Sequence, residues 1–324
     1  IQPGWTLFNL TNSFDKPPII LAMVDDRGRY RWYHQRSVSN HGSDTDVEVF
    51  EDHVLVGGNR SHFGPAMIDW EGNVTWKDNF RMHHEIEPST DSKSFYYLRE
   101  VDKCQQDVYS GALVKYDRES GQKSGEWPLC DYWFPPESNP SNDWSHLNAI
   151  EHVPGGDAVI LSSRGQHSLF KFDLADEEVD WVMGAEGDFG LTEDEYFFRQ
   201  HAPEIQPNGN ILLFDNGSLP RGEFSRPYSQ AIEIAYDTSE MSAEIVWKYR
   251  PDPDIFTPIW GDADRLKNGN TLVTFGFRDK TKNSRIMEVT KSKKKVWDLK
   301  AEKRWGWYRS ERVADPPVGH VVAQ

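Results

Sequence analysis

Histidine is the residue type whose placement in this sequence most clearly points to chemistry. Histidines stand immediately ahead of four expected buried strands, at His41, the pair His83-His84, His146 and His201. A neutral imidazole is a nucleophile and a proton carrier near neutral pH, and several imidazoles together can bind a metal ion. Because the four segments resemble one another, we expect their histidines to meet at one site rather than to serve four separate structural roles.

Two further polar residues are expected close to these histidines. Arg164 comes 18 residues after His146, at the end of an expected strand. Its guanidinium offers a planar set of donors suited to a tetrahedral oxyanion such as sulfate or phosphate. A salt bridge to one of the many carboxylates is the alternative role for this arginine. Asn148 shares a strand face with His146, where it could hold a histidine tautomer or bind substrate.

A metal-dependent hydrolase or oxidase is an alternative use of the same histidines. Three imidazoles can ligate zinc or copper, but an adjacent arginine would repel the ion. The run His83-His84-Glu85 also lacks the helical His-Glu-x-x-His spacing of a zinc motif. We therefore expect no metal and no cofactor. The sequence has no Gly-rich phosphate loop, Ser nucleophile elbow or Cys dyad, so nucleotide and acyl-transfer chemistry have little support.

The segment around His201 indicates how the histidines are positioned. Residues 200–217 read QHAPEIQPNGNILLFDNG, which is a histidine, a short strand, a Pro-Asn-Gly-Asn turn and a buried strand. Proline, asparagine and glycine supply the backbone angles that a hairpin turn needs. Hairpins of this layout are also expected at 46–56, 85–98, 150–162 and 264–275.

A second repeated phrase alternates with these hairpins and consists of a strand, a polar turn and a strand that ends in tryptophan. The six tryptophans are Trp32, Trp76, Trp127, Trp181, Trp247 and Trp297, with spacings of 44, 51, 54, 66 and 50 residues. Four strands per repeat at this period are typical of β-propeller blades. We interpret the tryptophans as packing residues between blades.

The repeat predicts an all-β fold, a six-bladed β-propeller, formed as a single domain by residues 1–324. Strands at about 302–313 are expected to pair with strands at about 5–33 and close the ring, because closure removes exposed sheet edges. Residues 314–324 then form a tail. Helix is nearly absent from this prediction, and 192–198 is the best short candidate.

Composition limits the partners of the chain. Lys and Arg number 36 against 52 Asp and Glu, and the net charge of -16 argues against nucleic acid as a partner. The mean hydropathy is -0.72, and no apolar run approaches the roughly 18 residues of a membrane span. We therefore expect a soluble chain without a membrane span.

Several features are compatible with export. The chain begins at Ile1 rather than Met, as it would after removal of an export signal, and Cys104 and Cys130 could form one disulfide in an exported protein. Glycosylation sequons begin at Asn9, Asn59, Asn73 and Asn216. We expect a secreted, cell-surface or periplasmic protein.

Taken in order, these motifs resemble the arylsulfate sulfotransferases that do not use the nucleotide donor PAPS. The resemblance covers nearly the whole chain. Its motifs are His83-His84-Glu85-Ile86, His146-Leu147-Asn148, Ser162-Ser163-Arg164, the run from His201 to Gly217, and Tyr308-Arg309-Ser310-Glu311-Arg312-Val313. The family fold is a six-bladed propeller, which agrees with the number of blades inferred from the repeat.

The resemblance implies roles for the candidate residues. His201 matches the histidine that is transiently sulfated, and His146, Arg164 and His84 match the residues that hold the sulfuryl group, with His83 as the alternative to His84. The implied reaction moves a sulfuryl group from an aryl sulfate donor to a phenolic acceptor by a ping-pong mechanism. A non-catalytic secreted or surface propeller with a binding or assembly role is the alternative function.

Overall fold

The computed structural model describes residues 1–11, 19–36, 45–58, 64–101, 109–133, 143–218, 226–277 and 284–314. Their strands form six four-stranded antiparallel sheets, the blades of a six-bladed β-propeller, which confirms the predicted fold class. Three sheets belong to one compact unit, here unit 1, made of Ile1–Met82 and Ile255–Gln324, and three to unit 2, His83–Asp254. The single domain over residues 1–324 stays a prediction.

Unit 1 holds the first, second and sixth sheets in chain order. The first sheet contains β24 (Gly306–Val313), β1 (Trp5–Thr11), β2 (Ile19–Val24) and β3 (Tyr30–Arg36). The second contains β4 (Val47–Phe50), β5 (His53–Val56), β6 (Ala66–Ile68) and β7 (Val74–Lys77). The sixth contains β20 (Asp262–Arg265), β21 (Thr271–Phe275), β22 (Arg285–Val289) and β23 (Lys295–Lys300).

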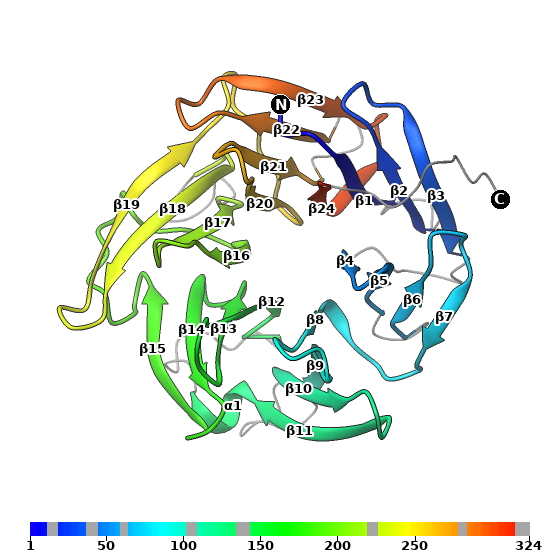
Figure 1. Cartoon of the computed structure of the whole chain (residues 1–324). Coiled ribbons are helices and arrows are strands. Elements are labelled where there is room, and N and C mark those ends of the chain that lie inside the picture. The colour runs from blue at the N-terminus through cyan, green and yellow to red at the C-terminus, as the bar shows by residue number, and fades with distance from the viewer. Residues whose placement is uncertain are drawn as a thin grey trace. The chain divides into compact units, whose positions relative to one another are not determined.

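The first sheet joins the two ends of the chain. Strand β24 pairs antiparallel with β1, from Trp5 opposite Val313 to Thr11 opposite Gly306. In Figure 1 the red β24 lies beside the dark blue β1. The predicted closure by N- and C-terminal strands is therefore confirmed.

Unit 2 holds the third, fourth and fifth sheets. The third contains β8 (His83–Pro88), β9 (Ser94–Val101), β10 (Ser110–Asp117) and β11 (Gln122–Pro128). The fourth contains β12 (Leu147–His152), β13 (Ala158–Ser163), β14 (Ser168–Asp173) and β15 (Glu178–Gly184). The fifth contains β16 (His201–Ile205), β17 (Ile211–Asp215), β18 (Gln230–Asp237) and β19 (Ser242–Tyr249).

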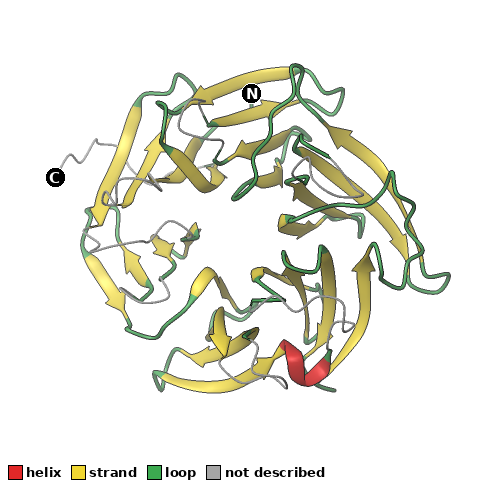
Figure 2. Ribbon diagram, turned by 180° about the vertical axis from the view of Figure 1, so that it is seen from behind, coloured by secondary structure: helices red, strands yellow, loops and turns green. Residues whose placement is uncertain are grey.

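One short helix, α1 (Leu129–Tyr132), follows β11 and is the red element in Figure 2. The helix expected at 192–198 is wrong, because that segment forms a turn. The carboxylate of Glu195 accepts hydrogen bonds from the backbone N–H and the hydroxyl of Thr192, at 2.9 and 2.6 Å, and the backbone N–H of Glu195 donates to the carbonyl oxygen of Thr192 at 2.8 Å, so these bonds close a single turn. No helix within the described ranges is long and apolar enough to cross a membrane.

The six repeated tryptophans lie on the outermost strands of their sheets, as their packing role predicts. In unit 1 Trp32 is fully buried and its Nε1 donates to the carbonyl oxygen of Trp70 in the next sheet, at 3.0 Å. The Nε1 of Trp297 likewise donates to the carbonyl oxygen of Asp26, at 2.7 Å. These two indoles therefore fill the space between two sheets, and each ties them by one hydrogen bond.

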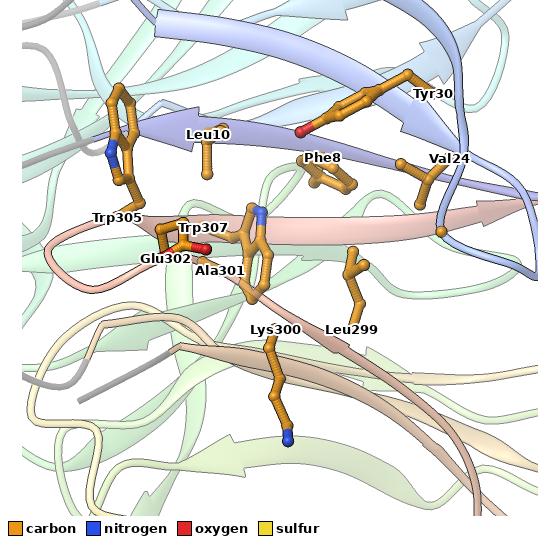
Figure 3. A pocket seen from close by; sticks show the side chains of 11 residues that line it. Phe8, Leu10, Val24, Tyr30, Leu299, Lys300, Ala301, Glu302, Trp305 and Trp307 are labelled. Carbon is orange, nitrogen blue, oxygen red and sulfur yellow. The ribbon is translucent and has the colours of Figure 1, made fainter.

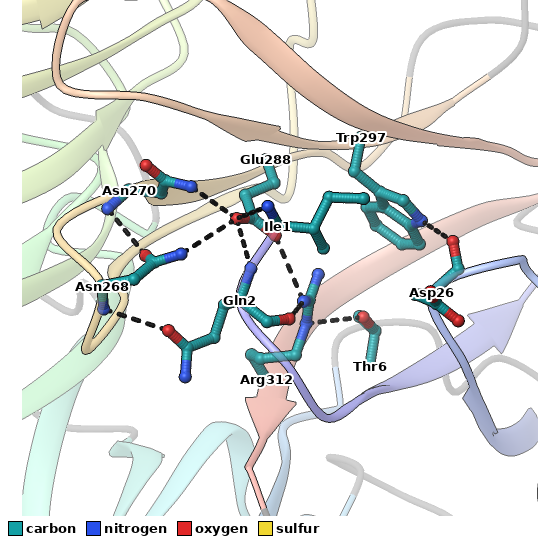
Figure 4. A network of polar contacts seen from close by, with 9 residues as sticks. All are labelled: Ile1, Gln2, Thr6, Asp26, Asn268, Asn270, Glu288, Trp297 and Arg312. Carbon is teal, nitrogen blue, oxygen red and sulfur yellow. Dashed lines mark hydrogen bonds and ion pairs between the residues drawn. The ribbon is translucent and has the colours of Figure 1, made fainter.

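A buried carboxylate holds the N-terminal segment against the sixth sheet (Figure 4). Oε1 of Glu288 accepts hydrogen bonds from the backbone N–H of Gln2 at 2.7 Å and from Nδ2 of Asn270 at 2.6 Å. Its Oε2 lies 3.2 Å from the guanidinium of Arg312 on β24. Because both oxygens are engaged, the charge of this fully buried side chain is compensated.

The structure also bears on the sequons and the cysteines. Asn9 and Asn216 are fully buried, so neither amide is accessible to a glycan in the folded chain. Asn73 is exposed in the turn between β6 and β7, and Asn59 lies outside the described residues. Cys104 also lies outside them, so its disulfide with Cys130 stays a prediction.

Candidate active site

Apart from His41, the predicted site residues belong to unit 2, where three edge strands begin next to the histidines. Strand β8 begins at His83 and β16 begins at His201, while His146 directly precedes β12. Strand β12 packs against both β8 and β16. The repeat therefore brings these segments together, as the sequence predicts. His41 lies outside the described residues.

Each of the three strands begins with an irregular backbone. The pairing register shifts at a β-bulge near the start of β8, β12 and β16. Three non-glycine residues at these starts have left-handed backbone angles, with φ of 61° at His84, 41° at His146 and 46° at Ala202. Such angles are costly for residues with a side chain, and bulges redirect side chains out of the regular strand pattern. The repeated distortion thus sets the direction of the histidines.

His201 is held in one tautomer. Its side chain is buried, and its Nδ1 lies 3.0 Å from the carbonyl oxygen of Arg199 and 2.7 Å from Oδ1 of Asn216. A carbonyl oxygen can only accept a hydrogen bond, so Nδ1 carries the proton. In the neutral ring the lone pair is then on Nε2, so Nε2 is the nitrogen that could act as a nucleophile or accept a proton.

The adjacent histidines His83 and His84 bond to each other. Their Nδ1 atoms are 2.7 Å apart, and each residue is 3% exposed. One Nδ1 must donate and the other accept, so the two rings cannot both be imidazolium while this bond exists. The ring of His84 also packs on the ring of His146 with 5.1 Å between centroids, which favours His84 over His83 for a direct role.

His146 is oriented by a carboxylate that the sequence analysis did not single out. Its Nδ1 lies 2.6 Å from Oδ2 of Asp143, and because a carboxylate accepts, Nδ1 carries the proton in this bond. The backbone N–H of Arg164 donates to the carbonyl oxygen of His146 at 3.1 Å. This bond holds the backbone of the arginine next to that of the histidine.

Asn148 connects the fourth and fifth sheets. The residue is fully buried, and its Nδ2 donates to the carbonyl oxygen of Gln200, which precedes His201, at 2.7 Å. The side chain of Gln200 in turn donates to the carbonyl oxygen of Ser163, the residue before Arg164, at 3.0 Å. These bonds fix the spacing of the segments that carry Arg164 and His201. The substrate-binding role of Asn148 stays a prediction.

A further histidine joins the same two segments and was missed by the sequence analysis. Nδ1 of His167 accepts a hydrogen bond from the backbone N–H of Arg199 at 3.1 Å. Burial, together with the charges of Arg199 and Arg164, lowers the pKa of His167 to about 4, so its ring is neutral near pH 7. The carbonyl oxygen of Arg199 accepts a hydrogen bond from Nδ1 of His201. By holding the backbone of Arg199, His167 therefore helps to place this carbonyl oxygen next to His201.

Metal binding was the alternative use of these histidines. Among the residues that the structure describes, no group of three or more His, Cys, Asp or Glu side chains is arranged to hold a metal ion. The fold and the site together define a β-propeller in which imidazoles, an arginine and buried amides from three neighbouring sheets of one unit are held by hydrogen bonds and, between His84 and His146, by ring packing.

Comparison with known proteins gives the family. The family model described as arylsulfotransferase (ASST) matches residues 6–309. The chain therefore belongs to the arylsulfotransferase family, as the sequence motifs predict.

A curated relative and two solved structures agree with this assignment and with the fold. The chain is 23% identical to the arylsulfate sulfotransferase AssT of Escherichia coli O6:H1 (strain CFT073) over 81% of its own length, and it spans 58% of that relative. A protein of unknown function from Bacteroides caccae superposes with a TM-score of 0.59 at 11% identity, covering 92% of this chain and 94% of that one. The Cps50 (Swd1) β-propeller domain of Myceliophteria thermophila gives 0.51 at 10% identity, covering 91% and 86%. At these identities the two structures support the fold alone.

Proposed function

We propose that the chain is a sulfotransferase that moves a sulfuryl group from an aryl sulfate to a phenolic acceptor without PAPS. The observation that carries this proposal is the fixed tautomer of His201, whose Nδ1 faces two acceptors and whose Nε2 therefore holds the lone pair. A neutral imidazole of this kind can attack sulfur near neutral pH.

In the first half of the reaction, Nε2 of His201 attacks the sulfur of the aryl sulfate. The new N–S bond forms as the bond between sulfur and the aryl oxygen breaks, and the electron pair of that bond leaves with the oxygen. The products are a sulfohistidine and a phenolate, which takes a proton from His84 or His146 to become the phenol.

The charge of the transferred group lies on its peripheral oxygens, so donors that face those oxygens contribute most to catalysis. Arg164 would bind two of these oxygens through its planar guanidinium. His84 and His146 would donate to the same group, with His83 and Asp143 holding the two rings by their Nδ1 atoms.

In the second half, a phenol binds where the first product left. Its oxygen attacks the sulfur of the sulfohistidine, its proton passes to the histidine that had given one up, and the N–S bond breaks. His201 regains its lone pair on Nε2, so the cycle closes without a cofactor. Two half-reactions that share one intermediate predict ping-pong kinetics.

The cellular setting belongs to the same proposal. We propose that residues 1–324 act as one propeller domain in an exported protein, secreted, on the cell surface or in the periplasm. A disulfide between Cys104 and Cys130 would suit an oxidising compartment.

The proposal is tested with purified protein, 4-nitrophenyl sulfate and phenol, in the absence of PAPS and added metal. We expect phenol-dependent release of nitrophenol, a release of about one equivalent when phenol is omitted, and one added sulfuryl group on the peptide that contains His201. His201→Ala should lose all three signals.

His34→Ala is the matched control, because His34 is a half-buried histidine on β3, in unit 1, and should retain full activity. Folded wild-type protein that releases no nitrophenol with any phenol tested would contradict the proposal. The chain would then be the non-catalytic propeller with a binding or assembly role. Sequential kinetics would contradict the sulfohistidine mechanism alone.

A further inference from the structure

A buried ion pair is connected to both of the acceptors that hold His201. Asp215 ends β17 and is fully buried, and its Oδ2 accepts a hydrogen bond from Nη1 of Arg226 at 3.0 Å. Asp215 directly precedes Asn216, whose Oδ1 lies 2.7 Å from Nδ1 of His201. The position of the first acceptor therefore depends on how Asp215 holds the end of this strand.

Asp215 also holds the segment that supplies the second acceptor, the carbonyl oxygen of Arg199. Its Oδ1 accepts a hydrogen bond at 2.9 Å from the backbone N–H of Phe198, the residue before Arg199. Arg199 itself has a left-handed backbone with φ of 53°, which is costly for a residue with a side chain and persists only where neighbouring contacts impose it. The hydrogen bond that Phe198 donates to Asp215 is one such contact.

Arg226 holds the same segment by two further hydrogen bonds. Its Nη1 also donates to the carbonyl oxygen of Tyr196, and its Nη2 donates to that of Glu193 at 3.2 Å. The guanidinium carbon lies 5.1 Å from the centroid of the Phe198 ring, which is within the range of a cation–π contact. One planar guanidinium thus joins the carboxylate to two backbone carbonyls, which an ammonium cannot do in the same geometry.

The contacts of Asp215 fit its ionised form. Two further donors bond to its carboxylate, the backbone N–H of Gly217 and Nε2 of Gln230, each at 3.0 Å. With the N–H of Phe198 and the guanidinium of Arg226, all four partners donate, whereas a protonated carboxyl would need an acceptor. Burial raises the pKa of Asp215, and the charge of Arg226 opposes this effect. Because the buried charge is compensated by these partners, we expect the removal of either member of the pair to displace the segments that it holds.

We propose that Asp215 and Arg226 are positioning residues for His201, which keep both acceptors in place and thereby keep the proton of the ring on Nδ1. The part of this inference that concerns catalysis rests on the sulfotransferase activity proposed above, whereas the part that concerns the tautomer does not. In that reaction the pair keeps the lone pair of His201 on Nε2. Neither residue acts on the sulfuryl group, so substrate binding should change little when one of them is replaced.

The deciding measurement is ¹⁵N NMR of protein labelled at its histidine rings, at a pH where the rings are neutral, because a ring nitrogen with a proton and one with a lone pair resonate far apart. The His201 resonances are those missing from His201→Ala. We expect one tautomer in the wild type, with the proton on Nδ1. Asp215→Asn keeps the size of the side chain but turns an amide N–H₂ toward donors, and should give a mixture of both tautomers. Arg226→Lys keeps the cation without the planar fork, so it should give a smaller fraction of the second tautomer, and it also carries the test if Asp215→Asn fails to fold.

Steady-state kinetics with 4-nitrophenyl sulfate are the second readout. We expect kcat to fall about 30-fold in Asp215→Asn and about tenfold in Arg226→Lys, because a misplaced nucleophile slows the reaction. KM should stay within about twofold of the wild type, since the contacts to substrate are kept. A wild type that transfers no sulfuryl group would contradict the activity proposed above, and the NMR comparison would still decide the positioning role.

Two variants in unit 1 serve as controls. Glu288→Gln weakens a comparable buried ion pair, and Phe8→Leu weakens apolar packing beside the cavity of about 210 Å³ that is drawn in Figure 3. Both should lower the Tm and leave kcat and the tautomer of His201 unchanged. A mixture of tautomers in these controls as well would show that the signal reflects general destabilisation, and it would overturn the proposal. A ring that stays protonated on Nδ1 alone in both Asp215→Asn and Arg226→Lys would do the same.

Discussion

Oδ1 of Asn216 lies 2.7 Å from Nδ1 of His201, and both side chains are buried. The asparagine directly follows the second strand of the hairpin, and the histidine begins the first. The hairpin therefore brings together a ring and the group that fixes its tautomer. In the proposed reaction this contact keeps the lone pair of His201 on Nε2.

Replacement of the Asn216 amide tests whether this contact fixes the tautomer of His201. We expect Asn216→Ala to lower kcat by about 100-fold, because removing the group that orients a catalytic histidine allows the wrong tautomer. The loss should be smaller than for His201→Ala, since the carbonyl oxygen of Arg199 still accepts from Nδ1. Steady-state kinetics with 4-nitrophenyl sulfate measure the change, and Asn216→Asp, which keeps an acceptor, should recover part of the activity. An Asn216→Ala variant as active as wild type would rule out the orienting role.

The paired histidines should differ in their effects. His84 packs on His146, whereas His83 acts through its Nδ1 bond to His84, so we expect His84→Ala to lower kcat/KM by about 100-fold and His83→Ala by about tenfold. His83→Asn should restore most of the loss, because an amide can replace the lost Nδ1 partner. The reverse order, with the larger loss at His83, would assign the direct role to His83.

Most of the fold could be predicted from the sequence because its signals are local and repeated. Each tryptophan phrase and each hairpin contains its own turn residues and its own buried strand, so four strands per repeat followed directly. The helix expected at 192–198 failed for a local reason as well. The hydrogen bond from the Thr192 hydroxyl to Glu195 is compatible both with the start of a helix and with a single turn. Tertiary packing therefore determines which of these two structures forms.

The site could be predicted only where it follows the repeat. His83 and His201 each begin an edge strand and His146 directly precedes one, so the repeat indicated that these segments lie together. Asp143 and His167 lie outside these positions, and their roles depend on contacts across a loop or between two sheets, which no spacing in the sequence indicates.

A buried carboxylate in unit 1 predicts a pH dependence of stability. Burial and the nearby charges of Asp46 and Asp262 raise the pKa of Glu311 from 4.5 to about 7, although the backbone N–H of Val49 donates a hydrogen bond to its carboxylate at 2.8 Å. The folded state therefore binds a proton that the unfolded state has released, and stability decreases as pH rises from about 4.5 to 7.

Glu311→Gln should remove this effect. The amide oxygen can still accept from Val49 but carries no charge, so we expect the variant to gain stability over wild type by roughly 1 to 3 kcal/mol at pH 8 and by little at pH 4.5. Urea denaturation at the two pH values measures the difference. A gain that is equal at both would show that the carboxyl does not titrate in this range.

For His167 the pH dependence of stability is expected to have the opposite sign to that for Glu311. Its pKa is lowered from 6.5 to about 4, so the unfolded state binds a proton that the folded state excludes, and stability falls as pH drops from 6.5 to 4. His167→Phe should lack this contribution, which is at most about 3 kcal/mol.

The same variant should also affect catalysis. His167→Phe leaves the backbone N–H of Arg199 without its acceptor. This change disturbs the carbonyl oxygen of Arg199 that orients His201. We therefore expect kcat to fall about tenfold with little change in KM. His152→Phe is the control, because burial also lowers the pKa of His152, but that ring packs on Tyr96 at the far end of β12. If both variants reduce kcat equally, the loss reflects general destabilisation; if only His167→Phe does, the histidine positions the nucleophile through Arg199.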